Sequence, residues 1–253
     1  MKKLKVSFVI PFHNEEKNVA PMIEQVTRYA QLQAKKWDFE VIPVNDRSKD
    51  KTKDVLRTYE KKYPFVKAVD RKNDTEELGN TMGKALLAGS KKAAGDIIIW
   101  TMGDRADDPE TYGTMVEKIQ DGYDLVFGSR YMPGGTWGSL DPTKAFLSSR
   151  GTVLARVLFG IKVHDITNAF RAFRKELLGK ITLDSSGFAI SPEFALKAHL
   201  AGYRLGEVPT VYYDRVEGLS NFKLWRMSYE YLKVYADLLV KMIFGSKTSS
   251  HNA

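Results

Sequence analysis

Short apolar runs alternate with helical patterns through the first half of the chain, and this alternation restricts the possible folds more than any other feature. Strands are predicted at residues 4–10, 39–44, 65–69, 96–100 and 123–128, and helices near 15–32, 50–62, 79–93 and 109–120. Such alternation is typical of a parallel, doubly wound α/β sheet. The strands are almost continuously apolar, which fits a sheet that helices cover on both faces.

Beyond residue 130 the pattern is less regular. A Gly-rich loop precedes a predicted helix at 143–161, and "YRLGEVPTVYYDR" (203–215) resembles a return strand. Near the C-terminus, apolar and aromatic residues recur at helical spacing, at Trp225, Tyr229, Leu232, Tyr235, Leu239 and Met242. This stripe predicts either packing against the chain's own domain or contact with a membrane surface, where basic residues would meet the headgroups: Lys223, Arg226, Lys233 and Lys241.

Composition excludes several classes of protein. The 253 residues, 43% of them apolar, suffice for one large domain, and the absence of cysteine excludes disulfides and thiolate metal sites. It also fits a reducing compartment. No window reaches the roughly 20 apolar residues of a transmembrane helix. The net charge of +8 favours an anionic partner. We do not expect nucleic acid, because the basic residues are spread through α/β motifs and no nucleic-acid module is present.

Acidic residues follow three of the predicted strands, where open parallel sheets bind their ligands. The segments are "PFHNEE" (11–16), "NDRSKD" (45–50) and "MGDRADD" (102–108). Their carboxylates could accept hydrogen bonds from a base and a ribose, or hold a hard divalent cation. Asp50 and Asp108 also fit helix N-caps, whereas Asp46 and Asp104 favour a functional role. Because no glycine-rich phosphate loop is present, a nucleotide would depend on carboxylates, a metal ion and basic side chains.

Six segments together carry a resemblance to a known family. "VIPFHNEEKNV" (9–19) resembles the P-x-x-N-E opening of the family 2 glycosyltransferases, and "VNDRSKDKT" (44–52) resembles their nucleotide-binding turn. Four further segments resemble the dolichyl and polyprenyl-phosphate hexose synthase branch of that family. They are "FGSRY" (127–131), "DITNAFRAF" (165–173), "SPEFALKAHLAGYRLGEVP" (191–209) and "DRVEGLS" (214–220). The resemblance implies a GT-A fold, a Rossmann-like, mostly parallel sheet with flanking helices, in a catalytic domain at residues 1–221. Residues 222–253 would form an amphipathic helical segment and a disordered tail.

The segment "WTMGDRADDPE" (100–110) stands where the family has its D-x-D metal motif. Asp104 matches the second acid of that motif, but Met102 stands at the first, and a thioether cannot replace a carboxylate on Mg²⁺ or Mn²⁺. Ala106 stands where the family often has glutamine. The resemblance implies a Mg²⁺ or Mn²⁺ ion held by Asp104, by Asp107 as a second ligand, and by donor phosphates and water.

The resemblance also assigns the donor site. The residues implied to bind the nucleotide sugar are Pro11, Asn14, Glu15, Asp46, Asn73, Gly79, Asp104 and Arg215. Arg47 replaces a glycine of the family's turn, which leaves the base open between uridine and guanosine.

An acceptor phosphate is already largely anionic at neutral pH, so it needs cations more than a strong base. Arg130 and Arg150 are predicted to bind it and to serve catalysis, since a guanidinium suits phosphate. Further acceptor-phosphate residues implied by the motifs are Arg171, Ser220 and Lys223. A sugar hydroxyl acceptor would instead require a carboxylate base, Asp165 or Glu193. With a phosphate acceptor, Asp165, also counted among the catalytic residues, orients an arginine or the donor sugar.

The expected function is an inverting, metal-assisted transfer of a hexose from a GDP- or UDP-hexose to dolichyl or polyprenyl phosphate. The resemblance implies a peripheral protein at the cytoplasmic face of a membrane, and recruitment by a membrane-protein partner is left open. Two alternatives stay open at this point. One is transfer to a hydroxyl of a glycan or lipid-linked oligosaccharide. The other is a catalytically silent protein that binds a nucleotide sugar or a lipid, as Met102 and Ala106 suggest.

Overall fold

The computed structural model describes residues 3–71, 80–213 and 224–245 of the chain. In chain order its elements are β1 (Lys5–Phe12), α1 (Glu16–Leu32), β2 (Asp38–Asp46), α2 (Thr52–Lys62), β3 (Val69–Arg71), α3 (Met82–Lys92), β4 (Ile97–Trp100), α4 (Thr111–Gln120), β5 (Leu125–Ser129), α5 (Pro142–Phe159), β6 (Arg171–Arg174), α6 (Leu177–Lys180), α7 (Ile190–Leu200), β7 (Leu205–Pro209) and α8 (Leu224–Gly245). The predicted elements of the first half are confirmed, although β3 is shorter and begins later than predicted.

The seven strands form one sheet in the order β3-β2-β1-β4-β6-β5-β7. The pairs β1–β2, β1–β4, β2–β3 and β5–β7 are parallel, as the alternation of patterns predicts. The alternation of patterns did not predict β6, which is antiparallel to both β4 and β5. This four-residue strand belongs to "NAFRAFRK" and is separated from β4 by α4, β5 and α5, so periodicity alone indicated neither its partners nor its direction. The sheet is therefore mostly parallel.

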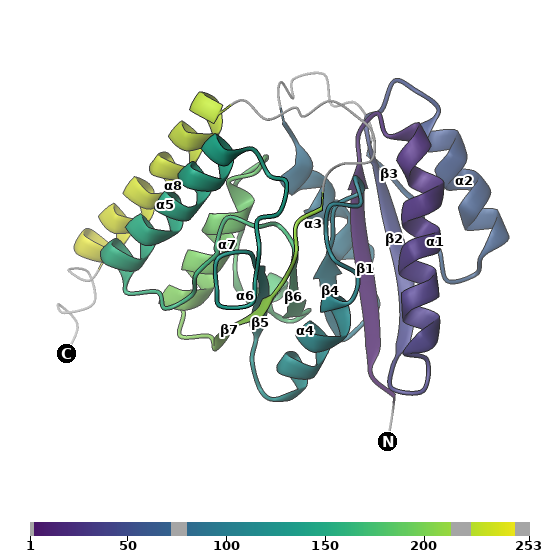
Figure 1. Ribbon diagram of the computed structural model, residues 1–253, viewed down its shortest axis with the longest axis horizontal. Helices are drawn as coiled ribbons and strands as arrows, with labels where there is room; N and C mark the ends of the chain where they lie inside the picture. The colour runs from purple at the N-terminus through teal and green to yellow at the C-terminus, as the bar shows by residue number, and fades with distance from the viewer. Residues whose placement is uncertain (1–2, 72–79, 214–223, 246–253) are drawn as a thin grey trace.

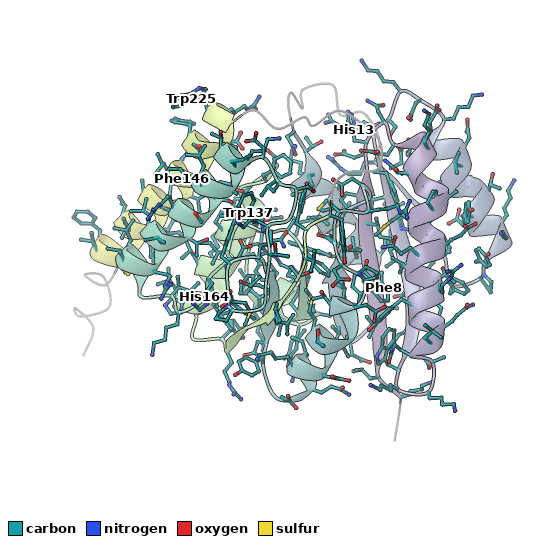
Figure 2. The ribbon with its side chains drawn as sticks, in the orientation of Figure 1. Phe8, His13, Trp137, Phe146, His164 and Trp225 are labelled. Carbon is teal, nitrogen blue, oxygen red and sulfur yellow. The ribbon has the colours of Figure 1, made fainter. Side chains whose placement is uncertain are left out.

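Helices cover both faces of the sheet (Figure 1). Helices α1, α2 and α4 pack on one face, and α3 and α7 lie on the other. Helix α5 and helix α8 lie side by side outside α7, at the opposite edge of the molecule from α1 and α2. Figure 2 shows Phe146 of α5 and Trp225 of α8 at this outer edge, in contrast to Phe8 within the sheet. Within the described residues, no helix is long and apolar enough to cross a membrane.

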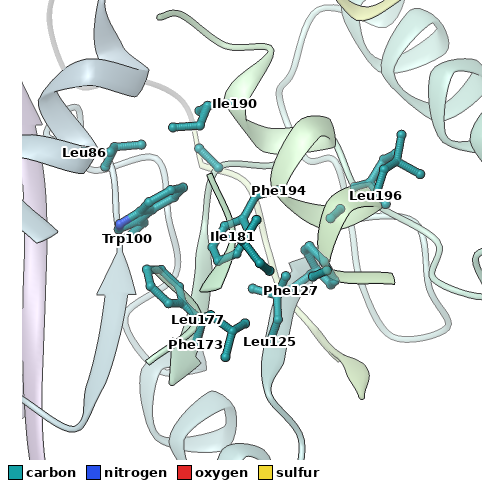
Figure 3. Close-up of a cluster of buried hydrophobic side chains, with 14 of the residues drawn as sticks. Leu86, Trp100, Leu125, Phe127, Phe173, Leu177, Ile181, Ile190, Phe194 and Leu196 are labelled. Carbon is teal, nitrogen blue, oxygen red and sulfur yellow. The ribbon is translucent and has the colours of Figure 1, made fainter. Parts of the chain in front are cut away.

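The core beneath α7 is rich in aromatic residues (Figure 3). The Trp100 ring lies edge-on to Phe173 with 5.1 Å between centroids, and the Phe173 ring lies edge-on to Phe194 of α7 at 5.0 Å. Edge-to-face contacts of this kind add to the free energy gained by burying the rings. This packing fixes the carboxyl end of β4, where the predicted acids begin.

Candidate functional site

A cavity of about 380 Å³ opens at the carboxyl ends of β1, β2 and β4. The chain leaves β1 toward β2 on one side and places β4 on the other, so this is the point where strand order switches. Open α/β sheets bind their ligands at such a switch point. The cavity is lined by Pro11, Phe12, His13, Glu15, Asp46, Arg47, Asn80, Thr81, Met82, Met102, Gly103, Asp104, Phe188, Arg226, Met227 and Glu230. Four predicted donor-site residues, Pro11, Glu15, Asp46 and Asp104, therefore come together here.

The loops after β1 and β2 are joined by side-chain to backbone hydrogen bonds. Asn14 accepts from Lys49 N at 2.7 Å, and Asn14 N donates to Ser48 Oγ at 3.0 Å. The carboxylate of Asp50 accepts from Thr52 N and Glu16 N, which lie at the starts of α2 and α1. Asp50 thus has a structural role at both helix starts, although Lys51 and not Asp50 is the N-cap residue of α2. Asn14 does not line the cavity, so its donor-binding role remains a prediction, while its observed role is to shape the loop.

Asp46 lies at the centre of a buried cationic cluster. Arg71 Nη1 donates to Asp46 Oδ1 at 2.5 Å, and Thr81 Oγ1 donates to Oδ2 at 2.8 Å. Arg47 Nε lies 3.5 Å from Oδ1, and its Nη2 donates to Thr81 Oγ1. Since both carboxylate oxygens accept hydrogen bonds, Asp46 faces the cavity as one member of a group that also contains Arg47, Arg71 and Thr81.

In the part of the chain that the structure describes, three residues other than glycine hold a positive φ, and they lie in the loops that follow β1, β2 and β4. The φ values are 55° at Asn14, 58° at Arg47 and 63° at Arg105. Such backbone is uncommon for side chains with a Cβ and concentrates at functional sites. The left-handed turn at Arg47, where the family has glycine, aims a cation at the cavity.

The turn after β4 brings Asp104 to the cavity. It passes close to the end of β1, since a Cβ on Gly103 would stand 2.6 Å from the Phe12 ring and 2.7 Å from Pro11 O. Asp104 is nearly buried, and its Oδ1 accepts from Ala106 N at 3.2 Å. Met102, at the first position of the motif, also lines the cavity. The wall thus has one carboxylate and one thioether where the motif has two carboxylates.

Asp107 faces the interior. Its Oδ2 accepts from Met102 N at 2.8 Å and from Thr101 Oγ1 at 3.0 Å. Burial raises the pKa of Asp107 to about 7, against the hydrogen bond from Met102 N, and the charge of Asp104 adds to the rise. Because Asp107 does not line the cavity, the geometry favours Asp104 over Asp107 as the ligand of a metal ion.

The donor groups at the cavity fit a metal ion only in part. In residues 3–71, 80–213 and 224–245, no three acid, histidine or cysteine side chains gather into a metal cluster. A site with Asp104 as its one carboxylate ligand is still compatible with Mg²⁺, which commonly keeps several waters and takes other oxygens from a bound diphosphate. The predicted Mg²⁺ or Mn²⁺ would therefore be held by Asp104 together with the donor.

Arg130 and Asp165, which are not among the residues that line this cavity, form a buried bidentate ion pair. Arg130 Nε donates to Asp165 Oδ2 at 2.7 Å, and Nη2 donates to Oδ1 at 3.1 Å. Asp165 also accepts from Thr167 N, Thr167 Oγ1 and Asn168 N. Its charge is thereby satisfied. These contacts fit a role in orienting Arg130 better than a role as a general base.

Two further predicted residues are also engaged in the interior. Arg171 is 0% exposed, and its guanidinium donates to the backbone carbonyls of Ile166, Asn168, Ala169 and Ser191. The prediction that Arg171 binds the acceptor phosphate is therefore wrong. Glu193, the second candidate base, accepts from Asp184 N, Ser185 N and Lys197 Nζ.

The structure does not bring Arg150 to Arg130. Tyr131, next to Arg130, contacts Ser148 on the buried face of α5. Arg150 follows two residues later and is exposed on the outer face, with its guanidinium 5.1 Å from the centre of the Phe146 ring. The prediction that Arg130 and Arg150 bind the acceptor phosphate together is therefore not supported by their positions. The remaining predicted residues, Asn73, Gly79, Arg215, Ser220 and Lys223, lie outside the described residues.

The sequence patterns missed the contribution of α8 to the cavity. Arg226, Met227 and Glu230, from its first two turns, line the wall, and Arg226 Nε donates to Glu230 Oε1 at 3.0 Å. The C-terminal stripe was predicted either to pack against the chain's own domain or to contact a membrane, and α8 packs on α5 and α7. Its alternating apolar and charged residues gave no signal of a site.

Comparison with known proteins agrees with this geometry. A family model described as glycosyl transferase family 2 matches residues 7–182. The dolichol-phosphate mannosyltransferase of Pyrococcus furiosus is 30% identical over 236 residues, which are 91% of this chain and 62% of that protein. The polyprenol monophosphomannose synthase of Mycolicibacterium smegmatis is 30% identical over 218 residues, 84% of this chain and 78% of that protein. The chain thus spans less than two thirds of the length of the first of these relatives.

Solved structures show the same fold. The crystal structure of glucosyl-3-phosphoglycerate synthase from Mycobacterium tuberculosis, in complex with Mn²⁺, uridine diphosphate and glucosyl-3-phosphoglycerate, aligns with a TM-score of 0.62 at 18% identity. The alignment covers 94% of this chain and 80% of that one. The expected GT-A fold, that of glycosyltransferases using nucleotide sugars, is confirmed. The chain belongs to family 2 of the glycosyl transferases.

Proposed function

We propose that this glycosyltransferase moves a hexose from a nucleoside diphosphate sugar to a polyprenyl or dolichyl phosphate, with inversion and with the help of a divalent cation. Three similar proteins are named as mannosyltransferases or a mannose synthase for dolichol, polyprenol and undecaprenyl phosphates, which makes mannose the first hexose to test. We further propose peripheral attachment at the cytoplasmic face of a membrane.

The choice of a phosphate acceptor depends on one observation, the buried ion pair in which Asp165 accepts hydrogen bonds from Arg130. Transfer to a sugar hydroxyl requires a carboxylate within hydrogen-bond reach of the acceptor. Both candidates for that base, Asp165 and Glu193, are buried and fully engaged. A phosphate monoester needs no such base, because it is already largely ionised at neutral pH. The rival hydroxyl acceptor is therefore disfavoured.

The chemistry then requires positioning and charge balance. An acceptor phosphate oxygen attacks C1 of the hexose, and the C1–oxygen bond to the nucleoside diphosphate breaks on the opposite face, with its electron pair passing to the diphosphate. Asp104 would hold a divalent cation, which supplies charge neutralisation at the diphosphate when bound. The Asp46–Arg47–Arg71 group would bind the nucleoside, and Arg130, oriented by Asp165, would contact the acceptor phosphate.

The test is transfer of radiolabelled hexose from a panel of GDP- and UDP-hexoses into organic-extractable polyprenyl phosphate, with Mg²⁺, Mn²⁺ or a chelator. We expect cation-dependent product with one donor. Asp104→Asn should lower the rate about 10²- to 10³-fold, as expected for loss of a group that stabilises developing charge. Met102→Asp, which restores a second carboxylate, should lower the cation concentration for half-maximal transfer by about tenfold.

Two outcomes would contradict the proposal. Product with a glycan hydroxyl acceptor, abolished equally by Asp165→Asn and Asp165→Ala, would establish the alternative acceptor. Tight binding of a nucleotide sugar without transfer to any acceptor would indicate the catalytically silent protein. Urea unfolding of each variant, measured beside the assay, separates loss of fold from loss of chemistry.

A further inference from the structure

The outer faces of α5 and α8 carry most of the exposed large apolar side chains. Twelve of the sixteen such side chains in the described residues lie on these two helices. On α5 the most exposed form a stripe at helical spacing, Phe146, Val153 and Val157. On α8 a second stripe consists of Trp225, Tyr229, Leu232, Val240 and Ile243. We call these eight residues the α5/α8 face.

This face is distinct from the one by which α8 packs on the domain. Met227, Tyr231, Tyr235 and Leu238 are buried, and Tyr235 Oη donates to Gly151 O of α5 at 3.1 Å. Trp225, by contrast, is 91% exposed and Val157 is 77% exposed. The single stripe expected from the sequence thus divides into two faces, because Tyr235 packs inward and Trp225, Tyr229 and Leu232 point outward. Exposed apolar patches of this extent mark contact sites.

The charge around the face indicates what covers it. Helix α5 contains Lys144, Arg150 and Arg156 and no acidic residue. On α8 the exposed Lys233 and Lys241 flank the apolar stripe, with one exposed acid, Asp237, between them. A second copy of the same face would bring the α5 cations toward each other, which is unfavourable. An anionic bilayer matches both properties, since basic side chains reach the headgroups while Trp, Tyr and aliphatic side chains enter the boundary with the acyl chains.

The two faces of α8 also connect this surface to the cavity. Trp225 and Tyr229 on the outer face alternate with Arg226, Met227 and Glu230, which line the cavity wall. Figure 2 shows Trp225 at the end of α8 nearest the strand-end loops and Phe146 beside it on α5. A bilayer on the outer face would therefore lie next to the rim of the cavity.

We infer that the α5/α8 face docks on an anionic lipid bilayer and sets the donor cavity at its surface. The functional reason for docking rests on the proposed function, because a lipid acceptor must reach the site from a membrane. Docking itself needs neither donor nor acceptor. In the docked state Phe146, Val157 and Trp225 enter the boundary region, while Arg150, Arg156 and Lys233 contact headgroup phosphates.

The test is sedimentation of the full chain with phosphatidylcholine vesicles in the absence of donor and polyprenyl phosphate. The vesicles contain either no phosphatidylglycerol or about 30 mol% of it, which gives a strong negative surface potential. We expect binding that rises with the anionic lipid and falls with salt. The double variant Val157→Glu/Leu232→Glu should bind at least about tenfold more weakly, because two exposed apolar contacts are replaced by charges that the bilayer repels. Arg156→Gln should weaken binding to the anionic vesicles about fivefold.

The matched control is Leu32→Glu, since Leu32 is 75% exposed at the end of α1, on the opposite edge of the molecule. This variant should bind vesicles as the wild type does. Absence of vesicle binding by the wild type at low salt, or equal weakening by Leu32→Glu, would overturn the inference. So would a concentration-dependent dimer that the double variant abolishes while vesicles are not bound.

The outcome is separable from that of the transfer assay. Vesicle binding without hexose transfer would leave docking established and the proposed function refuted. Transfer to a short, soluble polyprenyl phosphate by a protein that binds no vesicles would leave the function and refute docking.

Discussion

Two buried carboxylates on the same strand behave differently. Glu40, near the amino end of β2, is 1% exposed and accepts from Lys67, Lys5, Ser7 Oγ and Ala94 N. Asp46, at the carboxyl end, is nearly as buried and is also paired with two cations, Arg47 and Arg71. Asp46 lines the cavity described above and Glu40 does not, and Arg47, next to Asp46, has a left-handed backbone conformation.

The difference shows which observations identify a site. A buried, ion-paired carboxylate by itself is a common structural device, because its burial requires such partners. A cavity at the strand-order switch and positive φ in three loops are not needed for stability, and in the described residues they occur together at the carboxyl ends of these strands. Glu40 is therefore expected to govern stability, and Asp46 with Arg47 to govern donor binding.

The largest expected effect comes from substitution of a third buried carboxylate, Asp165, which like Glu40 and Asp46 is paired with a cation. Asp165→Asn leaves the Arg130 charge without its partner, so we expect a loss of about 3 to 5 kcal/mol in the free energy of unfolding. Urea unfolding at pH 7 measures it. A stable variant that retains its fold but loses all transfer would instead assign Asp165 to the chemical step.

Glu40 should make stability depend on pH in the acid range. Burial alone would raise the pKa of Glu40, but hydrogen bonds from Lys67, Ser7, Ala94 N and Lys5 outweigh it and lower the pKa to about 2. Its contribution is therefore complete above about pH 4.5 and is lost as the pH falls toward 2.

The shift corresponds to about 3 kcal/mol of stability at neutral pH. Glu40→Gln should remove that contribution at pH 7 and flatten the dependence of the unfolding free energy between pH 4.5 and pH 2. Donor affinity should not change, since Glu40 lies at the far end of β2 from the cavity. An equal loss of donor affinity in Glu40→Gln and in a cavity variant would break the distinction between the two ends of the strand.

The smallest expected effect comes from substitutions of Arg47, in the strained turn beside Asp46. Arg47→Gly and Arg47→Ala both remove the guanidinium, but glycine accepts a φ of 58° more readily, so it should be more stable than alanine by about 1 kcal/mol. Both variants should bind the nucleoside diphosphate about tenfold more weakly, an effect of roughly 1.4 kcal/mol for loss of one charged contact. Calorimetric titration with GDP and UDP, beside urea unfolding, measures the two quantities. Unchanged affinity in both variants would remove Arg47 from the donor site.

Local patterns were sufficient to predict much of this protein. Apolar strands separated by amphipathic helices define the parallel part of the sheet, and acids after those strands locate Glu15, Asp46 and Asp104 at one edge. These predictions succeed because the periods of strands and helices are properties of neighbouring residues. Since parallel strands run in the same direction, the residues that follow them meet at one edge of the sheet.

Other features depend on residues distant in sequence and became clear only from the fold. The pairing of β6 between β4 and β5, the sealing of Asp165 by Arg130 and the enclosure of Arg171 by backbone carbonyls each bring together groups that no local period relates. The two apolar faces of α8 are a further case. Helical spacing marks Trp225 and Tyr235 alike, but burial of one and exposure of the other follow from where α5 and α7 lie, because a side chain is covered only by elements that the whole chain places against it.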